Sequence, residues 1–321
     1  MNTKTIFIAS LLTMLIVASA QPEHFALPKA RVTVCIVDEN YKPIGNVKAG
    51  FAFCGERNQS QVVEVEGTTD NMGTFTGEGH TYGVIGSSLT KNGYYNGSAN
   101  LPGLSEAQNG RWQPWGATNT TILRKIENPV SMYAKSCWVK VSQFDKATGY
   151  DLVAGDWVAP FGNGKISDFV FSVRNNYTNF SRFDASVDLS FSNPLDGIQS
   201  TQLPKEFSCS DFIWPRIAPD SGYLPHTSLQ LSLPGNPYRI EDIEKQKFFF
   251  RVRTVEKDGK IVSALYGKIS EGFQLSPENA KTCGIRLSYY LNPKSLDRNM
   301  EFDLTRNLFT HLKEDEEPRS P

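Results

Sequence analysis

Apolar and polar residues alternate in many short runs along this chain, which is the spacing of strands that bury one face. Residues 32–37 and 47–53 are rich in β-branched and aromatic side chains, which favour strands. The second half repeats the pattern at residues 138–144, 169–173, 185–191, 285–291 and 300–304. Stretches with the spacing of an amphipathic helix are scarce. The pattern therefore predicts an all-β protein.

The clearest hairpin joins residues 248–255 to residues 261–268. Asp258 and Gly259 lie between these runs, and an Asp-Gly pair is a strong signal for a tight hairpin turn. Two short helices are also predicted. One covers residues 240–247, and the other begins at Ser276-Pro277-Glu278 and ends by Gly284.

The first third of the chain carries a two-part signature. Its opening consists of Val37, Asp38, Pro43, Ile44 and Val47, and its second part of Thr69, Asp70, Gly73 and Phe75. Together they resemble the carboxypeptidase regulatory-like, transthyretin-like β-sandwich family. The resemblance implies a seven-stranded sandwich of the kind found in secreted and surface proteins, without an active site. Residues 149–162 and 297–303 resemble segments of exported bacterial proteins that carry this sandwich at their N-terminus.

The ends of the chain and its middle predict the domain organisation. Residues 1–20 have a basic start, a short apolar run and small residues before Gln21, as in a cleaved signal peptide. Pro129 breaks the strand that precedes it. We therefore predict a linker at 21–29, a transthyretin-like β-sandwich at 30–128, a larger β-sandwich-like domain at 129–310 and a disordered tail at 311–321.

Charge and cysteine content narrow the possible partners. The formal net charge is −1, which argues against nucleic acid or an anionic membrane as a partner. No later run is long enough to span a membrane after signal cleavage. Cys35 and Cys54 lie on the first two predicted strands, so a disulfide forms if they face each other. The absence of a C-x-x-C pair and of clustered His predicts no metal site and no cofactor.

Four aromatic residues are the candidate binding residues. Trp112 and Trp115 lie in a loop-like segment with Pro114 and Gly116, and Tyr94 and Tyr95 follow an Asn-Gly turn. Such rings form a platform for a sugar when they are exposed. The alternative is that they close the edge of the sandwich and fill its core.

The sequence lacks the common catalytic motifs and offers one weaker candidate for a catalytic site. The sequence contains no G-x-S-x-G elbow, no H-E-x-x-H and no nucleotide-binding glycine pattern. Asp151 and Asp156 flank a loop with Trp157, and a glycosidase uses two carboxyl groups a few ångströms apart. The alternative is that both carboxylates cap turns.

These observations predict a secreted or periplasmic, non-enzymatic protein that binds protein or glycan, or has a structural role, at the cell envelope. A glycan-active hydrolase that uses the carboxylate pair is the alternative. A purely architectural spacer is a third hypothesis, and it would have no concave pocket with converging polar groups.

Overall fold

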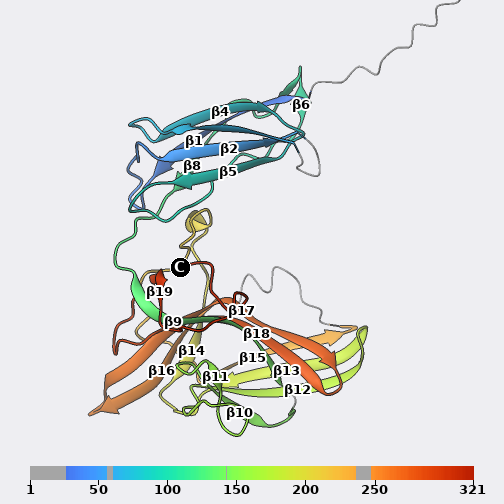
Figure 1. Ribbon diagram of the computed structural model, residues 1–321, viewed down its shortest axis with the longest axis vertical. Coiled ribbons are helices and arrows are strands. Elements are labelled where there is room, and N and C mark those ends of the chain that lie inside the picture. The colour runs from blue at the N-terminus through green and yellow to red at the C-terminus, as the bar shows by residue number, and fades with distance from the viewer. Residues whose placement is uncertain (1–26, 56–60, 142, 236–246) are drawn as a thin grey trace, which may run out of the picture.

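The computed structural model describes residues 27–55, 61–141, 143–235 and 247–321, with residues 271–273 described by their backbone only. It is an all-β protein of two sandwiches, one above the other in Figure 1. The predicted fold class is confirmed. The predicted signal peptide lies outside the described residues, as does nearly all of the helix predicted at 240–247.

The first domain is built from two facing sheets. β1 lies between β4 and β8, and short strands β7 and β6 extend this sheet at one end; β2 lies between β3 and β5 in the other sheet. The strands are β1 (Lys29–Val37), β2 (Lys48–Cys54), β3 (Val62–Thr68), β4 (Thr74–His80), β5 (Ile85–Thr90), β6 (Ala107–Gln108), β7 (Arg111–Trp112) and β8 (Thr118–Ile122).

The alternation of side chains explains the core of this domain. Val32, Val34 and Ile36 of β1 are fully buried, and Phe51 and Phe53 of β2 meet them from the facing sheet. Burying one such side chain contributes about 1.5–3 kcal/mol.

The turn that carries Asp70 and Gly73, in the second part of the signature, connects β3 to β4. The Asp70 carboxylate accepts hydrogen bonds from the Met72 and Thr74 amides at 2.9 and 2.8 Å, and the Gly73 carbonyl accepts one from Ile36 N at 2.8 Å. The two-sheet sandwich is therefore observed, and membership of the transthyretin-like family stays a prediction.

The second domain packs a five-stranded sheet against a six-stranded one. Their orders are β11-β10-β12-β13-β15 and β14-β16-β17-β18-β9-β19. The strands are β9 (Val130–Val141), β10 (Ala147–Asp151), β11 (Asp156–Trp157), β12 (Phe169–Asn179), β13 (Arg182–Ser190), β14 (Gly197–Thr201), β15 (His226–Leu233), β16 (Lys247–Lys257), β17 (Lys260–Asn279), β18 (Thr282–Asn292) and β19 (Phe302–Asn307), with one 3₁₀ turn at Lys205–Phe207.

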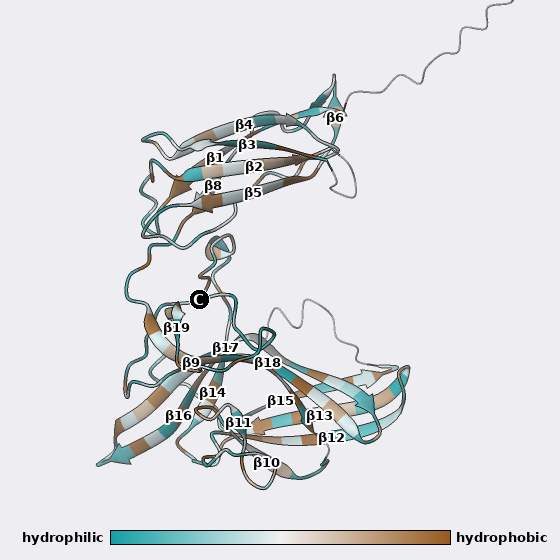
Figure 2. Ribbon diagram, viewed as in Figure 1, coloured by the Kyte–Doolittle hydropathy of each residue, from teal (hydrophilic) through white to brown (hydrophobic). Residues whose placement is uncertain are grey.

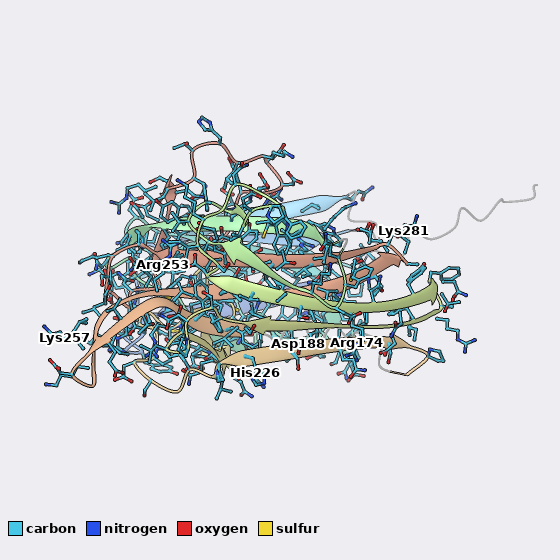
Figure 3. The ribbon with its side chains drawn as sticks, turned by 90° about the horizontal axis from the view of Figure 1, so that it is seen from below. Arg174, Asp188, His226, Arg253, Lys257 and Lys281 are labelled. Atoms are coloured by element: carbon cyan, nitrogen blue, oxygen red, sulfur yellow. The ribbon has the colours of Figure 1, made fainter. Side chains whose placement is uncertain are left out.

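Apolar residues recur along the strands of both sandwiches (Figure 2). Between the sheets of the second domain, the Phe169 ring lies 5.0 Å from that of Phe250, and Tyr289 is fully buried. The other face of the five-stranded sheet is polar. Arg174 and Asp188 are exposed there, and Figure 3 shows both from below. This alternation is typical of an antiparallel sheet with one wet face.

Two local predictions have different outcomes. The Asp258-Gly259 hairpin is confirmed, because it connects β16 to β17 with φ of 53° and 72° at the two residues. The helix predicted from Ser276 is wrong, because residues 276–279 continue β17 and Ser276 pairs with Gly284 of β18. Pairing along β18 overrides the local helix-start signal at Pro277.

The five cysteines are all free thiols. Cys35 is half-buried on β1, with its Sγ 3.7 Å from the Met72 carbonyl oxygen, whereas Cys54 is buried at the end of β2 in the other sheet. They do not form the disulfide considered from the sequence.

The tail predicted to be disordered lies against the second domain instead. Glu316 accepts a hydrogen bond from Ser136 N at 2.8 Å and forms an ion pair with Lys135 at 3.0 Å. The Tyr290 hydroxyl donates to the Ser320 carbonyl at 2.9 Å. Partners on β9 and β18 therefore hold this polar segment, although it lacks the apolar residues of a strand.

Candidate functional site: the cleft between the two domains

An ionic network joins the two domains. Glu39 of the first domain accepts from Arg124 at 2.9 Å and from Arg216 of the second domain at 2.6 Å. Arg216 also lies 3.1 Å from Glu301, whose side chain is only 1% exposed. Because these charges are paired and largely shielded from water, they resist being pulled apart.

Apolar contacts surround this network. Segment 203–225 covers the outer face of the six-stranded sheet, and its Phe212 and Trp214 are buried. The Tyr95 ring of the first domain lies 5.1 Å from that of Phe212, and its hydroxyl donates to Glu301 at 2.8 Å. Arg124 donates to the Phe212 and Trp214 carbonyls. The domains are therefore held in one relative orientation.

Beside this junction, two cavities adjoin each other and form what we call the interdomain cleft. Both are lined by Tyr94, Asn96 and Ile126. The polar cavity, of about 720 Å³, belongs entirely to the first domain. The acidic cavity, of about 390 Å³, lies between the domains and is also lined by residues of β19.

The polar cavity presents amides, hydroxyls and ammonium groups. It is lined by Asn46, Asn92, Thr68, Thr90, Lys48 and Lys91, in addition to the shared residues. Lys91 donates to the Gly45 carbonyl at 2.9 Å, so it holds the two rims of the cavity together. Amides and hydroxyls can both donate and accept hydrogen bonds, as the hydroxyl groups of a sugar require.

The acidic cavity combines apolar walls with carboxylates. Ile126, Phe302 and Leu304 contribute apolar surface, and Leu304 is 47% exposed. Asp211 and Asp303 contribute the charges. Asp211 is an exposed residue, and partial desolvation raises the pKa of its carboxyl.

A tight turn places Tyr94 between the cavities. Tyr94 N donates to the Lys91 carbonyl at 3.0 Å, and Gly93 between them has a φ of 80°, which favours glycine. The next residue, Tyr95, is fixed by Arg124 and points into the junction. Tyr94 is consequently half-buried and presents its free side to the cleft.

The four predicted binding residues are not on one face. Tyr95 is 8% exposed and occupied by the junction, so it does not offer the binding surface expected of it. Trp112 lies in β7, which pairs with the N-terminal end of β1. It is half-buried, and its indole N–H donates to the Thr81 carbonyl at 2.8 Å. Trp115, beside it, lies under the Arg111 guanidinium at 4.8 Å. Of the four residues, Tyr94 lines both cavities of the cleft, Tyr95 lines only the acidic cavity, and neither Trp lines the cleft.

Asp151 and Asp156 have structural partners. Asp151 is buried, and it accepts hydrogen bonds from the Val153, Ala154, Lys165 and Ile166 amides and from Arg253. Burial alone would raise its pKa, but these donors lower it, whereas a general acid needs a raised pKa. Asp156 accepts from the Trp157 and Asn163 amides. The pair therefore organises the loop of residues 151–168, as the turn-capping alternative predicts.

Apart from Tyr94 and Tyr95, the sequence did not reveal the residues that build the cleft and the junction beside it. Glu301 and Tyr95 are 206 positions apart, and Glu39 and Arg216 are 177 apart. The apolar run from Phe212 to Trp214 indicates a buried loop, but not the surface that buries it. Asp211 directly precedes this run and carries no signal of its own.

The described part of the chain contains no cluster of three or more His, Cys, Asp or Glu side chains arranged for a metal ion. Among the same residues, no helix is long and apolar enough to cross a bilayer.

Comparison with known proteins gives only distant likenesses. The chain matches no family model and no curated protein. It is similar to 3-chlorocatechol 1,2-dioxygenase from Rhodococcus opacus 1CP, with 10% identity over 32% of this chain and 62% of that one, at a TM-score of 0.25. A streptococcal ancillary pilin aligns with 10% identity over 73% and 57% of the two chains, at a TM-score of 0.22. A shaft pilin from Lactobacillus rhamnosus GG aligns with 14% identity over 54% and 91%, also at 0.22.

The chain thus spans less than two thirds of the length of the dioxygenase and of the ancillary pilin. At these TM-scores, none of the likenesses assigns a fold family or a function to it.

Proposed function

We propose that this protein is an exported, non-enzymatic binding protein that holds a glycan in the interdomain cleft. Export rests on the predicted signal peptide at residues 1–20. Binding rests chiefly on one observation, which is that the half-exposed Tyr94 ring lies where the polar and acidic cavities meet. An aromatic face bordered by amides and hydroxyls matches the apolar face and hydroxyl rim of a sugar ring.

The fixed junction supports this proposal. A cleft whose walls already have their bound arrangement loses little conformational entropy when a ligand enters. The Glu39, Arg216 and Glu301 contacts supply that arrangement.

A glycan array probed with the full chain tests the proposal. The wild-type protein should bind a defined subset of glycans. Tyr94→Ala should weaken that binding about thirtyfold, because truncating a central aromatic contact typically costs about 2 kcal/mol or more. Phe180→Ala is the matched control, since this ring is 82% exposed beyond the end of β12. No glycan binding, or equal binding by the Tyr94 variant, would overturn the proposal.

The same junction favours an architectural spacer as a second candidate, because an ion-paired interface keeps two domains in line. In that case the glycan array would be blank, and disrupting the junction would alter the shape of the protein in solution.

A further inference from the structure

The charged side chains that line the acidic cavity are all negative. Its charged side chains are the carboxylates of Asp211 and Asp303, and no Lys, Arg or His is among the described residues that line it. These two carboxylates differ in what they already bind.

Asp303 is neutralised from within its own strand. Its carboxylate accepts from the Thr305 amide at 2.9 Å, from the Thr305 hydroxyl at 2.7 Å and from Arg306 Nε at 2.5 Å. Arg306 also donates to the Pro129 carbonyl. The Asp303 carboxylate is therefore already paired with Arg306, although it borders the cavity.

Asp211 has no such partner. Its backbone amide donates to the Asn96 carbonyl at 2.8 Å, which fixes the residue beside the turn that carries Tyr94. Its carboxylate accepts no hydrogen bond and pairs with no cation from residues 27–55, 61–141, 143–235 or 247–321. Although Asp211 is exposed, it lines the acidic cavity, and a carboxylate without a counter-charge there favours a cation from outside.

The remaining charged groups of the junction do not supply that cation. Arg216 is shared among Glu39, Glu127 and Glu301, and Arg124 is bound to Glu39 and to backbone carbonyls. The Tyr94 ring, which also borders the acidic cavity, adds a face that attracts an ammonium group.

We propose that Asp211 selects glycans that carry a free amino group. The ammonium group of a hexosamine that is not N-acetylated forms an ion pair with Asp211 against the Tyr94 ring. Neighbouring sugar units extend into the polar cavity and meet its amides and hydroxyls. The inference rests on the proposed glycan-binding function and names the class of glycan that the site takes.

Calorimetric titration with two oligosaccharides of equal length tests this selectivity. One is the β-1,4-linked tetrasaccharide of glucosamine, and the other is its fully N-acetylated counterpart, which lacks the charge. At pH 6, where amines are protonated, the full-length wild-type protein should bind the glucosamine form at least about tenfold more tightly. Asp211→Asn should remove this preference.

Asp188→Asn is the matched control, because Asp188 is exposed on β13, in the sheet farther from the first domain. It should retain the preference, and both variants should unfold at the wild-type temperature. Equal wild-type affinity for the two tetrasaccharides, binding of neither, or a preference that survives in Asp211→Asn would overturn the inference. The glycan array and Tyr94→Ala judge the proposed function separately, since glycans without amines can still bind there.

Discussion

At the scale of single residues, the most unusual side chain is Lys268 in the middle of β17. It is fully buried, its Nζ donates to the Met300 carbonyl at 2.9 Å, and rings of Tyr290, Phe212 and Trp214 lie 4.7–5.4 Å away. Burial lowers the pKa of Lys268 well below its ordinary value. The cost of removing its charge from water therefore opposes folding.

Lys268→Met should stabilise the protein at pH 7 by about 1 kcal/mol or more, because an apolar side chain of similar length fills the same space. Between the lowered pKa and the ordinary value of about 10.4, the unfolded chain binds more protons than the folded one. Wild-type stability should therefore rise with pH in this range, and the advantage of the variant should shrink.

Urea unfolding at pH 7 and pH 10 measures both effects. Lys281→Met is the control, because Lys281 is exposed at the β17–β18 turn (Figure 3) and its replacement should change stability by less than about 0.5 kcal/mol. A loss of stability in Lys268→Met at pH 7 would show that the buried ammonium is favourable where it lies.

At the scale of elements, turns were more predictable than the partners of strands. Asp70 and Gly73, like Asp258 and Gly259, form turns through contacts within a few residues, so the sequence indicates them directly. The C-terminal part of β17 could not be recognised in the same way. Its strand conformation comes from pairing with β18, which overrides the helix signal at Pro277.

The Gly73 turn gives a matched pair of substitutions. Gly73 and Gly110 have φ of 74° and 72°, so alanine is strained by about 1–2 kcal/mol at either position. A Cβ at Gly73 would also lie 2.2 Å from the Ile36 carbonyl oxygen, whereas at Gly110 it meets nothing within 4 Å. Gly73→Ala should therefore lower the free energy of unfolding by at least about 2 kcal/mol more than Gly110→Ala. Similar losses in the two variants, measured by thermal unfolding, would contradict this account of the turn.

At the scale of the whole molecule, function depends on how the two sandwiches meet. The alternating pattern predicted strands and two β-rich halves. Tyr94 was predicted as a binding residue because it follows an Asn-Gly turn. The acidic cavity of the cleft could not be predicted, because its walls include residues 94–96, 126, 211 and 302–305 and need the complete fold to meet. The ionic junction that holds these walls also joins residues that are far apart in the sequence.

Glu301 is the residue through which this junction should respond to acid. Burial alone would raise its pKa, but the Asn128 and Glu127 amides, the Tyr95 hydroxyl and Arg216 outweigh burial and lower it. Its contribution to stability is therefore fully present above its unfolded pKa of about 4.3 and is lost as pH falls through the lower folded value.

Glu301→Gln should cost about 1–3 kcal/mol at pH 7, because it weakens charged hydrogen bonds in a buried site while Arg216 keeps Glu39 and Glu127. It should also flatten the fall in stability below pH 4.3. Glu256→Gln, at an exposed position near the end of β16, should behave as wild type in calorimetric unfolding between pH 3 and pH 7. If Glu301→Gln keeps the wild-type fall in stability at low pH, Glu301 does not contribute to the acid response of the junction.

The most direct test of the account is a crystal structure of the full chain with the glycan that binds best on the array. The account predicts a sugar ring against Tyr94, with further units over Asn46 and Asn92 and the two domains in the orientation of Figure 1. A glycan on Trp112 and Trp115 with the cleft empty, or domains that have rotated apart, would contradict it.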